Sequence, residues 1–161
     1  MEHELPIVDN HTHLVIYEPD GYPNKIVHSI ADNKVGFFIL KTALKTAIPW
    51  SNKDRLNKLV NFIESNKDKD WKDKFTHWRK EGQWSGRTKM TVLTVNMAFM
   101  RAGKPKRTFG ETCEELERLR QQFPDNIIPF FMADCRSGNM NKLFDHYIKD
   151  CNWGGVKFYL S

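Results

Sequence analysis

The chain has 161 residues, of which 40% are apolar and 28% are charged, and this composition is typical of a globular domain with a sizeable core. The net charge is +5, but lysines alternate with acids over residues 66–74. Such alternation indicates a solvated helix face rather than a surface for nucleic acid or an anionic membrane. We therefore expect no nucleic-acid partner.

No apolar run approaches the length of a membrane span, and the N-terminus shows no basic region followed by an apolar one. The cysteines at positions 113, 135 and 151 are odd in number and have no CxxC spacing. They are typical of reduced thiols rather than of a disulfide framework or a zinc ribbon. These features predict a cytoplasmic protein without a membrane partner.

The first half of the chain predicts one strand followed by a helical region. A buried strand is expected over residues 6–11, and an apolar helix over 34–48 that Pro49 ends. A second helix begins at the N-cap Ser51, and a third covers residues 71–81. This region is too long for one crossover helix, so we expect it to be a helical insertion between strands.

The second half alternates strands and helices. The β-branched residues 89–97 predict a buried strand, and Thr108 with Glu111 forms a capping box that opens a helix reaching about residue 123. A strand over 127–133 contains Pro129, which conflicts with sheet pairing, and a helix over 140–150 and a strand over 156–160 follow. Alternation of this kind predicts an α/β fold with a parallel sheet.

Two histidines follow the first strand at a spacing of two residues. His11 and His13 would project to one side of an extended chain, close enough to share one metal ion. Neutral imidazole is a common ligand of zinc, iron and manganese. The alternative is that both are ordinary surface residues, because a pair without a third ligand is a weak motif.

Four segments together resemble the amidohydrolase superfamily, in its amidohydrolase 2 branch of metal-dependent hydrolases and decarboxylases. They are residues 9–13 (DNHTH), 92–109, 127–136 (IIPFFMADCR) and 154–159 (GGVKFY). The chain departs from the family pattern at Cys135, where proline is frequent, and at Leu160, where proline usually follows. The resemblance implies strands 1–4 of a TIM-like barrel.

The resemblance implies that residues 1–161 are a single amidohydrolase-like domain, a half-barrel truncated after strand 4, since a complete barrel takes roughly 250 residues. The implied function is that of the N-terminal portion of a metal-dependent enzyme. A metal-activated water would hydrolyse a C–N or C–O bond of a small molecule, or a related decarboxylation would occur. Zinc is the expected ion, with manganese or iron as alternatives.

The competing interpretation is a non-catalytic half-barrel that works by binding or assembly, as a homo-oligomer or with a complementing C-terminal half.

Strand alternation adds further candidates. Lys157 and Tyr159 would point into the barrel, while Val156, Phe158 and Leu160 would pack against helices. The resemblance makes Lys157 the candidate third metal group, because some family members modify a strand-4 lysine. The alternative for Lys157 is an ion pair with a carboxylate such as Asp9 or Asp134.

Substrate binding is assigned to three residues. They are Asn96 and Arg136, near the ends of the second and third strands, and Tyr159. Arg136 is suited to an anionic substrate group. Loop or capping chemistry explains Asn96 and Arg136 equally well.

Overall fold

The structure, a computed structural model, describes residues 7–15, 70–82, 87–99 and 105–158, with single positions at 33, 35, 36, 38, 39, 42 and 58. The predicted helices over 34–48 and after Ser51 fall mainly outside these residues, although positions 35, 36, 38, 39, 42 and 58 are helical. The elements are β1 (Ile7–Thr12), α5 (Trp71–Gly82), β2 (Arg87–Leu93), η3 (Met97–Phe99), α6 (Phe109–Gln122), β3 (Ile127–Ala133), α7 (Met140–Phe144), η4 (Asp145–Asp150) and β4 (Gly155–Phe158).

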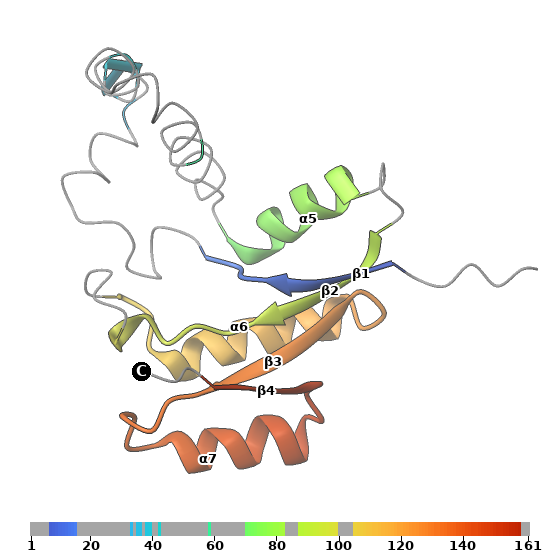
Figure 1. Ribbon diagram of the computed structural model, residues 1–161, viewed down its shortest axis with the longest axis vertical. Helices are drawn as coiled ribbons and strands as arrows, with labels where there is room; N and C mark the ends of the chain where they lie inside the picture. The colour runs from blue at the N-terminus through green and yellow to red at the C-terminus, as the bar shows by residue number, and fades with distance from the viewer. Residues whose placement is uncertain are drawn as a thin grey trace, which may run out of the picture.

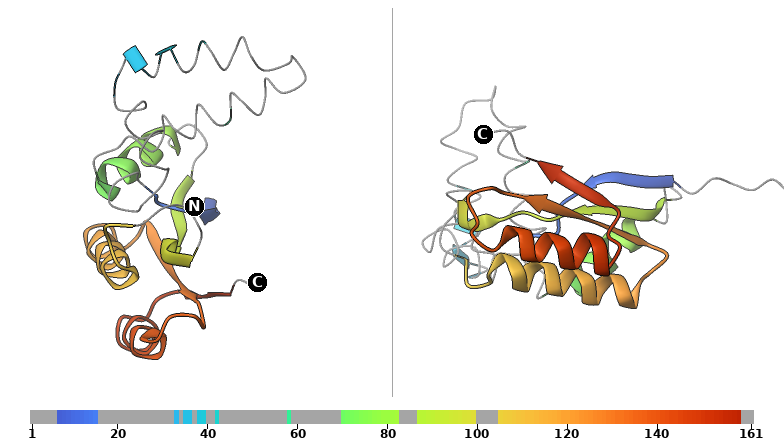
Figure 2. Two further views of the ribbon diagram at one scale, coloured as in Figure 1. Left: turned by 90° about the vertical axis from the view of Figure 1, so that its left-hand side faces the viewer. Right: turned by 90° about the horizontal axis from the view of Figure 1, so that it is seen from below.

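The strands form one parallel sheet in the order β1-β2-β3-β4. The sheet curls into a half-barrel with α5 between β1 and β2 in the chain (Figure 1). Helices α5, α6 and α7 all lie on one side of it (Figure 2). The predicted fold class is therefore confirmed. Within the described ranges, no helix has the length and apolar character needed to cross a membrane.

Aromatic side chains fill the space between the sheet and the helices. Phe131 of β3 is fully buried. Its ring centroid lies 5.5–6.4 Å from those of four other rings, which belong to Phe109, Phe144, Tyr147 and Trp153. Offset and edge-on pairs at these distances add stability beyond the area that they bury. We call the side of the sheet that packs against these helices the helix-covered face.

Helix α6 begins with the predicted capping box. The Thr108 side chain accepts a hydrogen bond from the Glu111 backbone, and the Glu111 carboxylate accepts one from the Thr108 backbone. Further along α6, Glu117 Oε2 accepts a hydrogen bond from Trp153 Nε1 at 2.8 Å. This bond ties the segment before β4 to the helix and fixes where β4 begins.

Pro129 lies inside β3, as the sequence predicts, without disrupting the sheet. Its carbonyl oxygen accepts a hydrogen bond from the Gly154 amide at 2.9 Å. The N–H and C=O of one strand residue point to the same neighbour. Here that neighbour is β4, which begins at Gly155 opposite Phe130. The missing N–H of Pro129 therefore falls before the start of β4.

Two sequence expectations are wrong. The predicted strand over 89–97 ends at Leu93, because the Thr94 hydroxyl takes over the pairing: it donates to the Phe130 carbonyl and accepts from the Met132 amide. Phe158 does not pack against helices but is 69% exposed. It stands at the outer edge of β4, where no further described strand pairs with it.

Candidate functional site

The side of the sheet opposite the helices, which we call the open face, brings together His11, His13 and Lys157. Lys157 of β4 places its Nζ 3.3 Å from His13 Nε2, directly after β1. In a flat four-stranded sheet the outer strands lie about 14 Å apart, at ~4.8 Å per spacing. The contact therefore depends on the curl of the sheet and on the length of the lysine side chain.

A backbone carbonyl orients the His13 ring. Nδ1 lies 2.8 Å from the Leu93 carbonyl oxygen, and since a carbonyl only accepts hydrogen bonds, Nδ1 carries the proton. Nε2 then presents its lone pair toward Lys157. Metal-binding histidines are typically held in this way, with the second ring nitrogen donating to a carbonyl or carboxylate.

His13 is also biased toward the neutral form. Burial lowers the pKa of His13, and the positive charges of Lys157 and His11 lower it further, against the opposing hydrogen bond to Leu93. Only the neutral ring has a lone pair to offer. The environment of His13 thus favours the protonation state of a ligand or an acceptor.

His11 completes the pair from the exposed side. The His11 and His13 ring centroids lie 5.0 Å apart, at an interplanar angle of 80°. His11 also lines a broad hollow of about 560 Å³ in the open face. The other lining residues are Asn10, Thr91, Leu93, Phe130, Val156, Lys157 and Phe158.

A β-bulge in β1 determines which side chains reach the open face. Asp9 pairs with Met90 and Thr12 with Val92, so three steps along β1 match two along β2. Asp9 consequently turns to the helix-covered face, where its Oδ2 accepts a hydrogen bond from Trp78 Nε1 at 3.2 Å. Simple alternation would place Asp9 on the same side as the two histidines.

The carboxylate partners proposed for Lys157 are engaged by other side chains. Asp134 accepts hydrogen bonds from Arg136 Nε at 2.7 Å and Nη2 at 2.6 Å. Hydrogen bonds from Arg136 lower the pKa of Asp134. Asp9 lies against Trp78. Lys157 contacts His13 Nε2, and an ion pair of Lys157 with a carboxylate stays a prediction.

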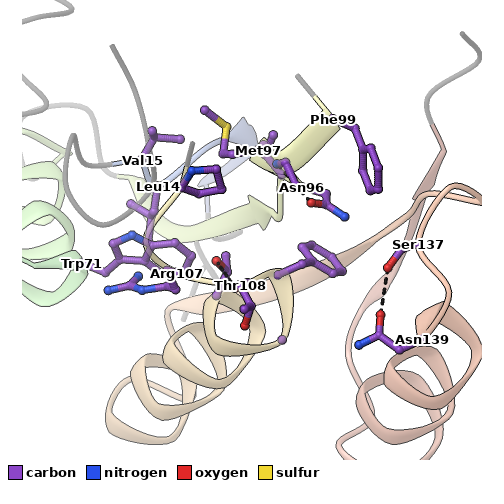
Figure 3. A pocket seen from close by; sticks show the side chains of 16 residues that line it. Leu14, Val15, Trp71, Asn96, Met97, Phe99, Arg107, Thr108, Ser137 and Asn139 are labelled. Atoms are coloured by element: carbon purple, nitrogen blue, oxygen red, sulfur yellow. Dashed lines mark hydrogen bonds between the residues drawn. The ribbon is translucent and has the colours of Figure 1, made fainter. Parts of the chain in front are cut away.

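The substrate-binding candidates separate in space. Arg136 is held by Asp134 and lies over the Phe99 ring at 4.6 Å, so its charge is already matched. Asn96 does not line the hollow beside His11 and Lys157 but lines another pocket, beside the first turn of α6 (Figure 3). Tyr159 lies outside the described residues.

A second polar cluster was not foreseen from the sequence. Cys151 Sγ lies 3.7 Å from His146 Nε2, and His146 Nδ1 lies 3.3 Å from Asp150 Oδ2. The order resembles a thiol–imidazole–carboxylate relay. However, burial raises the pKa of the Cys151 thiol, as does the charge of Glu117. Both effects disfavour the thiolate that such a relay needs, so we take the open face as the candidate site.

The described residues provide part of a metal site. No group of three or more His, Cys, Asp or Glu side chains among them is placed to hold an ion, so the candidate set is two imidazoles and the Lys157 amine. Comparisons of the chain with protein-family models, curated proteins and solved structures find no match.

Proposed function

We propose that the open face is part of the divalent-metal site of an amidohydrolase-like enzyme acting on a small molecule. The observation that carries the proposal is the convergence of His13 and Lys157, 144 residues apart in the chain, at 3.3 Å. The orientation of the His13 ring by Leu93 supports it, because that bond leaves Nε2 as the acceptor.

Each residue has a distinct part in the proposed site. The Leu93 carbonyl fixes the direction of the His13 ring, burial lowers the pKa of His13, and His11 supplies a second imidazole 5.0 Å away. Lys157 now occupies the Nε2 lone pair of His13, so its amine would have to turn away for His13 to hold a metal ion. Its positive charge would then lie at the wall of the hollow, where it would stabilise an anionic group of a substrate. A bound zinc ion, or manganese or iron, would lower the pKa of a water to about 7 and polarise a carbonyl.

The chemical class follows from these parts. A pair of imidazoles beside a hollow of about 560 Å³ suits hydrolysis of a C–N or C–O bond in a small molecule. Decarboxylation of a related acid uses the same groups. The fold hosts many reactions and does not choose between these two.

Metal uptake tests the proposal. The purified chain is incubated with Zn²⁺ or Co²⁺, desalted and assayed by elemental analysis, and the cobalt form is examined for the visible absorption bands of imidazole ligation. We expect the H11A/H13A double variant to lose uptake and the bands. The matched control is H77A, which removes an exposed histidine of α5. Equal uptake by the wild type and the double variant would refute the proposal.

The same preparation tests assembly as the alternative function. The observation in favour of assembly is the exposed Phe158 on the edge strand β4, because exposed apolar edges recruit other strands. Light scattering is measured alongside metal uptake. Self-association without metal uptake would support a binding or assembly module, as a homo-oligomer or with a complementing half-barrel, in place of the metal site.

A further inference from the structure

A separate pocket lies at the ends of β1 and β2 and beside the first turn of α6 (Figure 3). Its volume is about 500 Å³, within the range of small-molecule sites. It shares no lining residue with the hollow of the open face among the described residues.

The wall of this pocket is mainly apolar and aromatic. Trp71, Phe99 and Phe109 supply the rings, and Leu14, Val95 and Met97 supply further apolar surface. Such a wall buries the body of an apolar ligand, and aromatic rings favour stacking or edge-on contact with another ring. The body of the ligand is therefore apolar and flat.

One charged side chain enters this pocket. Among the described residues that line it, Arg107 alone carries a charge. Arg107 also borders a neighbouring hollow that contains Glu111, where hydrogen bonds with Thr108 lower the pKa of Glu111 and the charge of Arg107 lowers it further. The Arg107 guanidinium lies 5.5 Å from the centroid of the Trp71 ring, which places it at the aromatic wall (Figure 3). A single guanidinium beside an apolar wall selects a single negative charge, and its planar fork matches a carboxylate.

A buried amide provides a second polar contact. Asn96 is only 3% exposed, and its Oδ1 accepts a hydrogen bond from the Ala98 amide. Its Nδ2 makes no hydrogen bond in the described part of the chain, although each amide N–H is a donor. Figure 3 shows the Asn96 amide directed into the pocket. Such an amide N–H at a pocket wall can donate to an oxygen of a bound ligand.

We propose that this pocket binds a small aromatic monocarboxylate, with the carboxylate at Arg107 and the ring against the aromatic wall. A ring hydroxyl, where a ligand has one, would be placed to reach Asn96. The capping box of α6 already satisfies N–H groups at the start of this helix. The ligand is therefore recognised by the Arg107 and Asn96 side chains and not by the helix N-terminus. The site is independent of the metal site proposed above.

Phenylacetate is the probe, and phenylacetamide is its uncharged partner of the same shape. Binding is followed on the full chain by backbone amide chemical shifts. We expect phenylacetate to bind with a Kd of about 1 mM, as befits a ligand of about ten heavy atoms. The shifts are expected at residues 96–99 and 105–110. Phenylacetamide should bind at least about tenfold more weakly, because a charge-assisted hydrogen bond is lost.

The variants assign the contacts. R107Q should weaken phenylacetate binding at least about tenfold and leave phenylacetamide unchanged. R118Q is the matched control, because Arg118 lies exposed on α6 and pairs with Glu114 and Glu115 outside the pocket. H11A/H13A should bind phenylacetate as the wild type does, whether or not metal binds at the open face.

Three results would overturn this inference: equal affinity for the acid and the amide, no loss in R107Q, or shifts confined to residues of the open face. If R107Q does not fold, the comparison of the two ligands on the wild type decides the question alone.

Discussion

The two faces of the sheet are built from alternate residues of the same strands, yet they differ in kind. On the helix-covered face, Phe131 is fully buried among aromatic rings. On the open face, its neighbour Phe130 lies half-buried beside a hollow that also contains His11 and Lys157. At these two positions the helix-covered face is the more tightly packed, and the ionisable side chains of the hollow lie on the other face.

Truncation of the two adjacent phenylalanines gives the largest expected effect. F131A should destabilise the protein by about 3–5 kcal/mol, because it leaves a cavity inside a closed aromatic cluster. F130A should cost only about 1–2 kcal/mol, since part of that ring already contacts water. Denaturant unfolding measures both. Equal losses would show that the open face is as much a part of the core as the covered one.

Glycine substitution tests how closely the open face is packed. A Cβ at Gly155 would lie 2.6 Å from Phe130 Cε1, so G155A should cost about 1–2 kcal/mol through overpacking. The control is G138A, where a Cβ meets no atom within 4 Å, and we expect a change within about 0.5 kcal/mol. If G155A matches G138A in thermal and denaturant unfolding, the Phe130 ring moves freely and the open face is loosely packed.

The smallest effect is a dependence of stability on pH that originates at His13. Its pKa in the folded chain is lowered from the ordinary value of 6.5, mainly by burial. Between 6.5 and the lowered value, the unfolded chain binds a proton that the folded chain does not, so stability falls as the pH falls. Above pH 6.5 this contribution to the pH dependence vanishes.

The measurement compares the wild type with H13Q. The free energy of unfolding of the wild type should decline more steeply from pH 7 to pH 5, and the His13 ring resonances should titrate below 6.5. Parallel pH profiles for the two proteins would contradict the burial of His13.

The sequence alone predicts the local elements well, because their causes are local. The capping box at Thr108 opens α6 as expected, and Pro129 remains in β3 because its neighbouring strand begins late. The end of β2 was missed because the Thr94 hydroxyl replaces a backbone partner. Nothing in the residue pattern of β2 signals that exchange.

The candidate site depends on contacts between residues far apart in the chain, which the pattern of apolar and polar residues does not predict. His11 and His13 were expected to lie together, and their rings do. The contact of Lys157 with His13 requires the curl of the whole sheet, so a carboxylate seemed the natural partner. The pocket beside α6 combines Trp71, Asn96 and Arg107 from three separate segments, and no sequence motif links them.

The bulge in β1 divides this short strand into two segments whose side chains contact different sides of the sheet. Asp9 is fixed to Trp78 on the side of the helices, whereas His11 and His13 face away from them. A change at Asp9 therefore alters the attachment of α5 without moving either imidazole, and a change at the histidines leaves that attachment intact. The part of β1 before the bulge therefore serves the packing of α5, and the part after it presents the imidazoles to the open face.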